Sequence, residues 1–473
     1  MPLILGTNSI KDTGYDVDNS CRFDDGSSCQ MRRAGVDGGD QDKFTLSMWI
    51  KRGVITTNFP RLFTSKASND DRFEIYFGSD DSLYIEGRDN GTATLNLNTN
   101  RKFRDPSAWF HFLLAVDTDQ ATASNRAKLY INGVQETSFA TETYPAQDGN
   151  IGINTSSFPI RIGEEDGNGV DFDGYLTEIV YLDGVQKANT DFGEFDGDSP
   201  TIWKPKDVSD LSSEKGNNGF YLDFEDSSNL GNDVFGGTDF SVSNLSSIDQ
   251  TTDTCTNNFC TINPLTSTQD FNLSEGNLKL GASSDNAVIN GTLAGTIDNT
   301  NSGYYFEYKV NASNLGNNGE GFRMGIVNVD DIMLSPFTSA RQLNVTNPAL
   351  VYQTATNGGD NRTDTDIGSA SNGDICMVAW KNGKVWLGVN GTFVNSGNPS
   401  AGSGEQFSGL SGEFIPFLMC SLTNGVNGAQ FNFGNPSFSI SSGNADANGF
   451  GNFEFAPPTG FFALCTKNIA EIG

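Results

Sequence analysis

The sequence predicts an all-β protein with few or no helices, built from two tandem β-sandwich (jelly-roll) domains. Apolar residues rarely follow a helical period and instead alternate in short runs bounded by Gly, Asn and Asp. The chain contains 54 Gly and 35 Phe, which suits many short strands joined by tight turns around aromatic cores. Its 473 residues exceed the size of one hydrophobic core, so two or three domains are expected.

The clearest strand of the first half lies at residues 44–50. Phe44, Leu46, Met48 and Ile50 occupy alternate positions, so they share the core-facing side of a strand. Further segments with this pattern, each ending at an Asp, Gly or Asn turn, are residues 73–77, 82–86 and 127–131. The first half therefore reads as a sandwich with one face of each strand in the core.

Four Asx-Gly pairs between apolar runs predict β-hairpins. Both central residues of the tightest hairpin turn need a positive φ, which Asn, Asp and Gly tolerate best. The pairs are Asn132-Gly133, Asp183-Gly184, Asn382-Gly383 and Asn390-Gly391. Two pairs fall in each half of the chain, which favours two separate sandwiches.

The composition along the chain suggests four segments. An N-terminal arm, residues 1–20, precedes the first clear strand and could dock on a neighbouring subunit. Sandwiches are expected at residues 21–195 and 266–473. Residues 196–265 are rich in Asp, Ser, Asn and Gly, and we interpret them as a linker with partial strand content. Within it, residues 219–224 are apolar at alternate positions and could complete the first sandwich.

Charge and hydropathy exclude several classes of function. With 29 Lys and Arg against 59 Asp and Glu, the net charge is −30, so nucleic acids and acidic membrane faces are repelled. No run approaches the roughly 20 apolar residues of a membrane span. The first six residues lack the basic and apolar regions of a signal peptide, so we expect synthesis in the cytoplasm and no membrane insertion.

Seven cysteines make an odd set. Cys21 and Cys29, like Cys255 and Cys260, are close enough in sequence for short-loop disulfides. In a chain without an export signal, reduced and mostly buried thiols are the simpler expectation.

The first half resembles the LamG-like domains of concanavalin A type. The resemblance lies in residues 44–52, 108–117, 129–135 and 172–179. The second half is similar to SPRY domains, in residues 303–308, 321–326, 373–376, 414–417 and 431–434. These resemblances imply two recognition modules, a LamG-like domain followed by a SPRY-like domain. LamG-like domains often bind calcium at a rim.

The order of segments along the whole chain resembles a group of marine tailed-bacteriophage virion proteins. The matching residues are 3–10, 192–195, 200–206, 257–265 and 458–466. This resemblance implies a structural protein at the virion surface, with other virion proteins as partners. We expect a symmetric homo-oligomer that acts as a tail fibre or adhesin and recognises a host cell-surface glycan, since the modules are of recognition type. A capsid decoration or head fibre protein is the first alternative.

No catalytic residue set emerges from the sequence, and we expect no enzyme. His111, the sole histidine, lies within a strand pattern, which suits a hydrogen-bonded structural ring better than a catalytic base. Glycoside hydrolases use paired carboxylates, and the nearest approach, residues 194–198, lacks the last Glu of the usual spacing. A polysaccharide-cleaving hydrolase or depolymerase remains the competing class.

Acidic loops supply the candidate metal ligands. Carboxylates around glycines could bind Ca²⁺, the one expected cofactor candidate, at Asp70, Asp71, Glu164, Glu165, Asp166, Asp171 and Asp173. In so acidic a chain the alternative is that these loops are simply solvated.

Tryptophans could bind sugars by stacking, but their positions favour other roles. Trp49, Trp109, Trp380 and Trp386 lie in strand patterns typical of a core. Trp203, flanked by prolines, is interpreted as a plug against a domain face. The sequence therefore assigns no ligand-binding residue.

Overall fold

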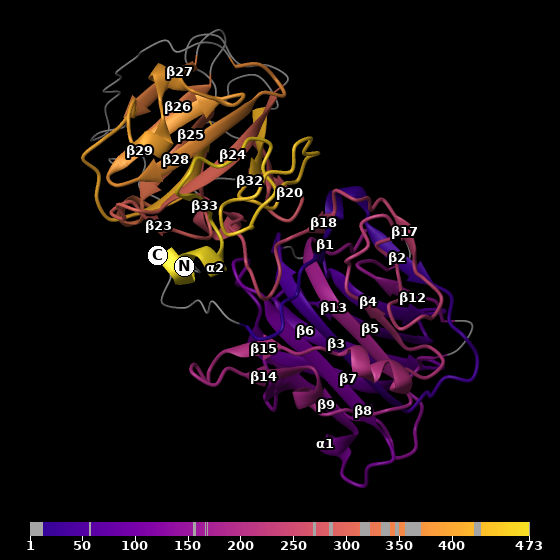
Figure 1. Ribbon diagram of the computed structural model, residues 1–473. Helices are drawn as coiled ribbons and strands as arrows, with labels where there is room; N and C mark the ends of the chain where they lie inside the picture. Colours follow the sequence, from indigo (N-terminus) through magenta and orange to yellow (C-terminus); the bar gives the residue numbers. More distant parts are fainter. Residues whose placement is uncertain are drawn as a thin grey trace. The chain divides into compact units, whose positions relative to one another are not determined.

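The structure is a computed structural model (Figure 1) that describes residues 13–55, 58–154, 158–165, 167, 169–267, 271–282, 287–312, 322–332, 341–345, 350–354, 370–420 and 427–472. Its contacts divide the chain into two compact units. We call Asp12–Thr256 the N-terminal unit, and the unit that contains Asn257–Gly473 the C-terminal unit. Within the described residues, no helix is both long enough and apolar enough to cross a membrane.

The N-terminal unit contains two antiparallel sheets of eight strands each. Sheet 1 has the order β10-β9-β8-β3-β13-β1-β18, with β16 paired to β13. Its strands are β1 (Ser20–Phe23), β3 (Lys43–Arg52), β8 (Phe110–Asp117), β9 (Ala127–Ile131), β10 (Val134–Gln135), β13 (Gly174–Asp183), β16 (Phe220–Leu222) and β18 (Gln250–Thr251).

Sheet 2 has the order β11-β7-β6-β5-β4-β12-β2-β17. Its strands are β2 (Gln30–Arg33), β4 (Arg61–Lys66), β5 (Arg72–Phe77), β6 (Ser82–Asp89), β7 (Thr92–Lys102), β11 (Phe139–Thr143), β12 (Ile160–Ile162) and β17 (Ser241–Ser243). The unit also has a separate hairpin of β14 (Gly193–Phe195) and β15 (Trp203–Pro205), and a one-turn helix, α1 (Ala123–Arg126).

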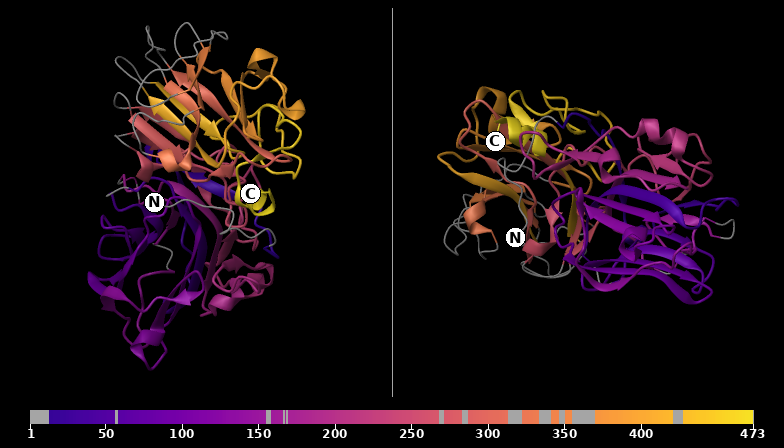
Figure 2. Two further views of the ribbon diagram at one scale, coloured as in Figure 1. Left: turned by 90° about the vertical axis from the view of Figure 1, so that its left-hand side faces the viewer. Right: turned by 90° about the horizontal axis from the view of Figure 1, so that it is seen from below.

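The core of the N-terminal unit lies between the two sheets, whose layers are visible in Figure 2. The predicted alternation in β3 is confirmed, because Phe44, Leu46, Met48 and Ile50 are all fully buried in this core. From sheet 2, β5 contributes Phe73, Ile75 and Phe77. The side chains between these positions point to the opposite face of each sheet.

The predicted linker belongs largely to the N-terminal unit, which ends at Thr256. β16, β17 and β18 pair with β13, β2 and β1, so the strand expected at residues 219–224 does join the first sandwich. A second core covers the outer face of sheet 1 and joins Leu113 and Leu182 to Phe192, Val208 and Tyr221. The polar composition of this segment made it look like a linker. Its few apolar residues cover the outer face of sheet 1, which is therefore buried on both faces.

The described part of the predicted N-terminal arm packs on its own unit. The Val17 amide donates to Thr256 Oγ1 at 3.1 Å, and Thr177 Oγ1 donates to the Asn19 carbonyl at 2.7 Å. Residues 1–12 lie outside the described residues. Docking of the arm on a neighbouring subunit stays a prediction.

The C-terminal unit contains two further sheets (Figure 2). The first has the order β19-β22-β31-β25-β26-β27, with β23 on β31, and the second has the order β20-β21-β32-β24-β28-β29-β30, with β33 parallel to β24. The first sheet comprises β19 (Ile262–Asn263), β22 (Ala287–Gly291), β23 (Gly295–Thr296), β25 (Phe322–Asn328), β26 (Arg341–Val345), β27 (Leu350–Thr354) and β31 (Glu413–Cys420).

The second sheet of this unit comprises β20 (Phe271–Ser274), β21 (Lys279–Ala282), β24 (Gly303–Ala312), β28 (Ile375–Lys381), β29 (Lys384–Val389), β30 (Thr392–Phe393), β32 (Asn427–Asn432) and β33 (Phe461–Ala463). The chain ends with α2 (Thr466–Ile472). Aromatic side chains fill the core, among them Phe306, Tyr308, Trp380 and Phe431. The unit begins with β19, so residues 257–265 belong to this sandwich rather than to a linker.

Short 3₁₀ turns connect several strands. They are η2 (Asp25–Ser27), η3 (Asn189–Asp191), η4 (Ser209–Glu214), η5 (Pro264–Thr266), η6 (Val329–Asp331), η7 (Val394–Ser396) and η8 (Pro399–Ala401). With these and two short α-helices among the described residues, the predicted all-β class with few helices is confirmed.

Three of the four predicted hairpins are confirmed. Asn132-Gly133, Asn382-Gly383 and Asn390-Gly391 have positive φ at both residues and join paired strands. The hairpin at Asp183-Gly184 is wrong: only Gly184 has a positive φ, and the Asp183 carboxylate accepts from the amides of Asp40 and Asn218 at 2.7 and 2.9 Å. Its side chain therefore holds loops together instead of forming a turn.

The described cysteine side chains are free thiols, at Cys21, Cys29, Cys255, Cys260, Cys376 and Cys465. Burial raises the pKa of Cys376 and of Cys465 to about 12, so both stay protonated at neutral pH. Neither short-loop disulfide is present. The side chain of Cys420 lies outside the described residues.

Candidate functional site

His111 is a fully buried structural residue on the outer face of sheet 1. The Trp203 indole N–H donates to its Nδ1 at 3.1 Å, and Ser47 Oγ lies 2.8 Å from its Nε2. Because Nδ1 accepts, the neutral ring carries its proton on Nε2 and donates to Ser47, so it cannot take the proton of that hydroxyl. Burial lowers the pKa of His111 to about 3, and Trp203 fills the space beside it as the predicted plug.

The outer face of sheet 2 carries a band of charged and aromatic side chains. On β5, Arg72, Glu74 and Tyr76 alternate with the core residues at positions 73, 75 and 77 and so point away from the core. Opposite them on β6 lie Arg88, Glu86 and Tyr84 in register. This face is therefore formed by side chains from neighbouring strands and not by one contiguous sequence motif.

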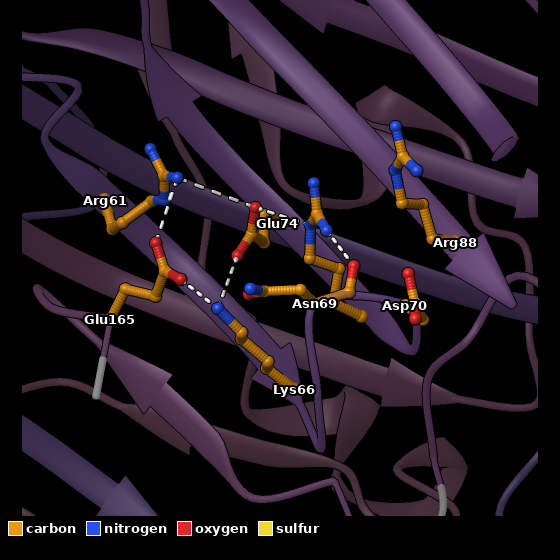
Figure 3. Close-up of a pocket in the computed structure, with 8 residues that line it drawn as sticks. Arg61, Lys66, Asn69, Asp70, Glu74, Arg88 and Glu165 are labelled. Atoms are coloured by element: carbon orange, nitrogen blue, oxygen red, sulfur yellow. Dashed lines mark hydrogen bonds and ion pairs between the residues drawn. The ribbon is translucent and has the colours of Figure 1, made fainter. Parts of the chain in front are cut away.

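A pocket of about 370 Å³ opens on this face (Figure 3). It lies within the size range of small-ligand sites. Its lining is almost wholly polar: Arg61, Lys66, Asn69, Asp70, Arg72, Glu74, Arg88 and Glu165. Four cations thus gather in one pocket of a chain with a net charge of −30.

Ion pairs organise the floor of the pocket. Arg61 Nη2 lies 2.9 Å from Glu165 Oε2 and 3.6 Å from Glu74 Oε2. Lys66 contacts the same two carboxylates, and Figure 3 shows both acids facing these two cations. Arg72 adds a third cation, with Nε 3.0 Å from Glu74 Oε2.

The two carboxylates respond in opposite directions. Burial raises the pKa of Glu74, whose side chain is almost fully enclosed, although the nearby Arg61 opposes this shift. The pKa of Glu165 is lowered, since hydrogen bonding from Lys66 and the charge of Arg61 outweigh its partial burial. The pocket thus holds two acids of different strength.

Aromatic rings adjoin the charged residues. Tyr76 and Tyr84 stack with centroids 5.1 Å apart and an interplanar angle of 8°. The Arg61 guanidinium lies 4.0 Å from the centroid of Tyr76. Tyr76 is buried by these contacts, whereas Tyr84 is half-buried and keeps part of its ring accessible. A ring surface beside charged donors and acceptors is the combination that sugar rings, with one apolar face and polar edges, require.

Several buried polar atoms of this face lack hydrogen-bond partners among the described residues. They include Glu74 Oε1, Arg61 Nε and the side-chain carbonyl oxygens of Asn96 and Asn98 on β7. Asn98 and Tyr84 are directly paired across β6 and β7. Since buried polar groups are normally satisfied, these atoms indicate a surface prepared for water or a polar ligand.

A second cluster lies where η2 meets the start of β13. Asp24, Asp25 and Asp173 each offer a carboxylate oxygen, and these oxygens lie within 4.8 Å of one another. Burial raises the pKa of Asp25, and the charges of Asp24 and Asp171 raise it further. Crowded carboxylates of this kind fit Ca²⁺, which prefers several oxygen ligands.

The predicted calcium ligands are divided between different places. Asp70 and Glu165 line the pocket, and Asp171 and Asp173 lie at the acidic cluster. Asp71 accepts from the amide of Asn90 at 2.9 Å and closes a turn, and Glu164 accepts from the amide of Gly167. Asp166 lies outside the described residues.

Sequence reasoning missed Asp24 and Asp25 and most of the pocket. The signal for the pocket was present: charged residues and tyrosines alternate with core residues at 72–77 and 82–88. In the sequence, this alternation is the same as that of any strand with one face in solvent. The pocket becomes visible only when the strands lie side by side in the fold. Asp24 and Asp25 come close to Asp173 only through the fold.

The family model of the concanavalin A-like lectin/glucanases superfamily matches residues 24–193. These residues form a concanavalin A-like domain. The match covers the acidic cluster and most strands of both sheets, so both sites belong to the concanavalin A-like domain. A search of curated proteins finds no match.

Solved structures resemble parts of the chain at low similarity. The SPRY domain of human HERC1 shows 16% identity over 36% of this chain and 96% of its own, with a TM-score of 0.28. Mouse laminin alpha1 domains LG4-5 show 10% identity over 90% of each chain, with a TM-score of 0.29. A SAP-like pentraxin from Limulus polyphemus shows 15% identity over 35% of this chain and 77% of its own, with a TM-score of 0.26.

Proposed function

We propose that this chain is a glycan-recognition protein of a tailed-phage virion surface, which binds a host-surface carbohydrate without cleaving it. The observation that carries the proposal is the polar pocket on sheet 2, beside which two tyrosines stack on the same face. Fixed guanidinium, ammonium and carboxylate groups can each bond neighbouring hydroxyls of a sugar. The concanavalin A-like fold is one that lectins use.

The arrangement of the two pocket acids favours binding over hydrolysis. Glu74 and Glu165 share the same two cations, Arg61 and Lys66, which hold both carboxylates in fixed ion pairs. A glycosidase acid must instead deliver its proton to the glycosidic oxygen. Ion pairing to two cations leaves little freedom for that transfer.

A glycoside hydrolase is the second candidate. The opposite pKa shifts of Glu74 and Glu165 favour it, since an acid and a base with separated pKa values are the usual division of labour in such enzymes. It predicts new reducing ends when polysaccharide is incubated with the protein, and their loss in Glu74→Gln.

A printed array of neutral, uronic-acid-containing and sulfated glycans tests the binding proposal. We expect binding that Arg88→Gln and Glu74→Gln each weaken at least tenfold. Arg88→Gln is the substitution that disturbs the fold least, since among the described residues the Arg88 guanidinium makes one hydrogen bond, from Nη1 to the Gly91 carbonyl at 3.3 Å. Glu142→Gln, on β11 of the same sheet and outside the pocket, is the matched control. Binding that survives all three substitutions would refute the pocket.

The virion assignment is supported by the segment resemblances in the sequence. Imaging of intact particles with a labelled antibody to this chain tests it. Label at tail tips supports a fibre or adhesin, and label over capsid faces supports decoration instead. Particles without label would exclude both.

A further inference from the structure

Phe59, beside the pocket, combines exposure with backbone strain. It has a φ of 56°, and 45% of its surface is exposed. A bulky aromatic residue is a true outlier in the left-handed region, because its β-carbon crowds the following carbonyl. Pro60 follows it and restricts the backbone of Phe59 further. With nearly half of its surface exposed, Phe59 buries less apolar area than a core aromatic residue to compensate for such a conformation, so core packing alone does not explain it.

Arg61 connects this residue to the pocket. Its Nη1 donates to the Phe59 carbonyl at 2.8 Å, while its Nη2 reaches Glu165. The amide of Phe77 donates to the Pro60 carbonyl at 3.2 Å and anchors the next residue to β5. The strained residue and the residue after it are therefore both held by elements that build the pocket.

The ring of Phe59 continues the aromatic surface of sheet 2. Its centroid lies 6.4 Å from that of Tyr76, at an interplanar angle of 67°, and Tyr76 stacks on Tyr84 in turn. Three aromatic residues thus follow one another along the edge of the pocket. Phe59 is the exposed end of this row.

We propose that Phe59 is a second subsite, on which a sugar ring stacks while a neighbouring sugar occupies the pocket. The proposal rests on the proposed function and adds that the ligand is an oligosaccharide of at least two residues. Aromatic faces bind the apolar face of a pyranose ring. Strain held by surrounding structure is typical of such binding positions.

The test compares affinity with stability in Phe59→Gly and Phe59→Ala. Glycine adopts the left-handed region freely, so Phe59→Gly should raise the midpoint of urea unfolding. The ligands are a monosaccharide and a tetrasaccharide of the glycan type that binds most tightly on the array. Phe59→Gly should also lower the affinity for this tetrasaccharide roughly five- to tenfold. Affinity for the monosaccharide should stay unchanged, and Phe59→Ala should show the same loss of tetrasaccharide binding.

Phe195→Ala is the matched control, since Phe195 is 41% exposed on β14 of the same unit. It should leave tetrasaccharide affinity unchanged. If Arg88→Gln weakens tetrasaccharide binding and Phe59→Gly does not, the subsite is overturned and the proposed function stays intact. Loss of stability together with loss of affinity in Phe59→Gly would mean a structural role and would also overturn it. If the unaltered protein binds no glycan of the array, both the subsite and the proposed function are overturned.

Discussion

Glu178 shows how one residue can carry a pH dependence. It has a φ of 52° at a bulge in β13, where the register with β3 shifts between Thr177 and Val180. The Tyr221 hydroxyl lies 2.9 and 3.0 Å from its two carboxyl oxygens. Burial raises the pKa of Glu178 to about 8, and the charges of Asp223, Glu225 and Asp207 contribute.

The pH dependence of stability follows from this raised pKa. The folded protein keeps the Glu178 proton up to about pH 8, while the unfolded chain releases it near the ordinary glutamate pKa of 4.5. The stability of the folded state therefore falls as pH rises through this window, by on the order of 5 kcal/mol, since one pKa unit is worth about 1.36 kcal/mol.

Glu178→Gln should remove this contribution. Urea unfolding at pH 5 and at pH 8.5 is the measurement, and the variant should lose less stability than the unaltered protein between the two. Glu194→Gln, which changes an exposed glutamate, should follow the unaltered protein. Identical losses in all three proteins would show that Glu178 titrates normally.

At the scale of elements, the end of the N-terminal unit is tied to its central strand. Lys51 of β3 and Asp253 form an ion pair of 2.7 Å with both side chains fully buried. The Trp109 indole N–H donates to the other carboxylate oxygen at 2.9 Å. Because loss of either partner would leave an unpaired charge in the interior, this pair ties Asp253 to β3.

Asp253→Asn should destabilise the N-terminal unit by about 3–5 kcal/mol, because it removes the carboxylate from the buried Lys51 ammonium. Asp119→Asn is the control: its pair with Lys43 is exposed, so the loss should stay below about 1 kcal/mol. Guanidinium unfolding followed by tryptophan fluorescence measures both. Equal effects of the two substitutions would contradict the prediction.

The hairpins show what local sequence can predict. Asn132-Gly133 was predictable because the turn needs nothing beyond its own two residues. Asp183-Gly184 is also an Asx-Gly pair, but the Asp183 carboxylate accepts hydrogen bonds from loops that are distant in sequence. Asn90-Gly91 joins β6 and β7 with positive φ at both residues and was not among the predicted turns.

At the scale of the molecule, each hydrophobic cluster draws its residues from one unit only. We therefore expect two transitions in scanning calorimetry. Asp253→Asn should lower only one of them, which identifies the transition of the N-terminal unit.

Added Ca²⁺ should raise that same transition and leave the other in place, and Asp25→Asn with Asp173→Asn should abolish the rise. One transition that every variant shifts equally would contradict two independent cores. Transitions unchanged by Ca²⁺ and by excess chelator would exclude the calcium site.

The sequence by itself determined the all-β class, the core face of β3, three hairpins and the structural role of His111. These follow from period, turn chemistry and residue type, which act within a few residues. Apart from the strand at residues 219–224, the tertiary structure alone decided that residues up to Thr256 belong to the first sandwich, and it alone decided that Glu74, Glu165 and Arg61 meet in one pocket. Those contacts join strands far apart in the chain, and an alternating strand looks the same in sequence whether its outer face meets water, a covering segment or a ligand.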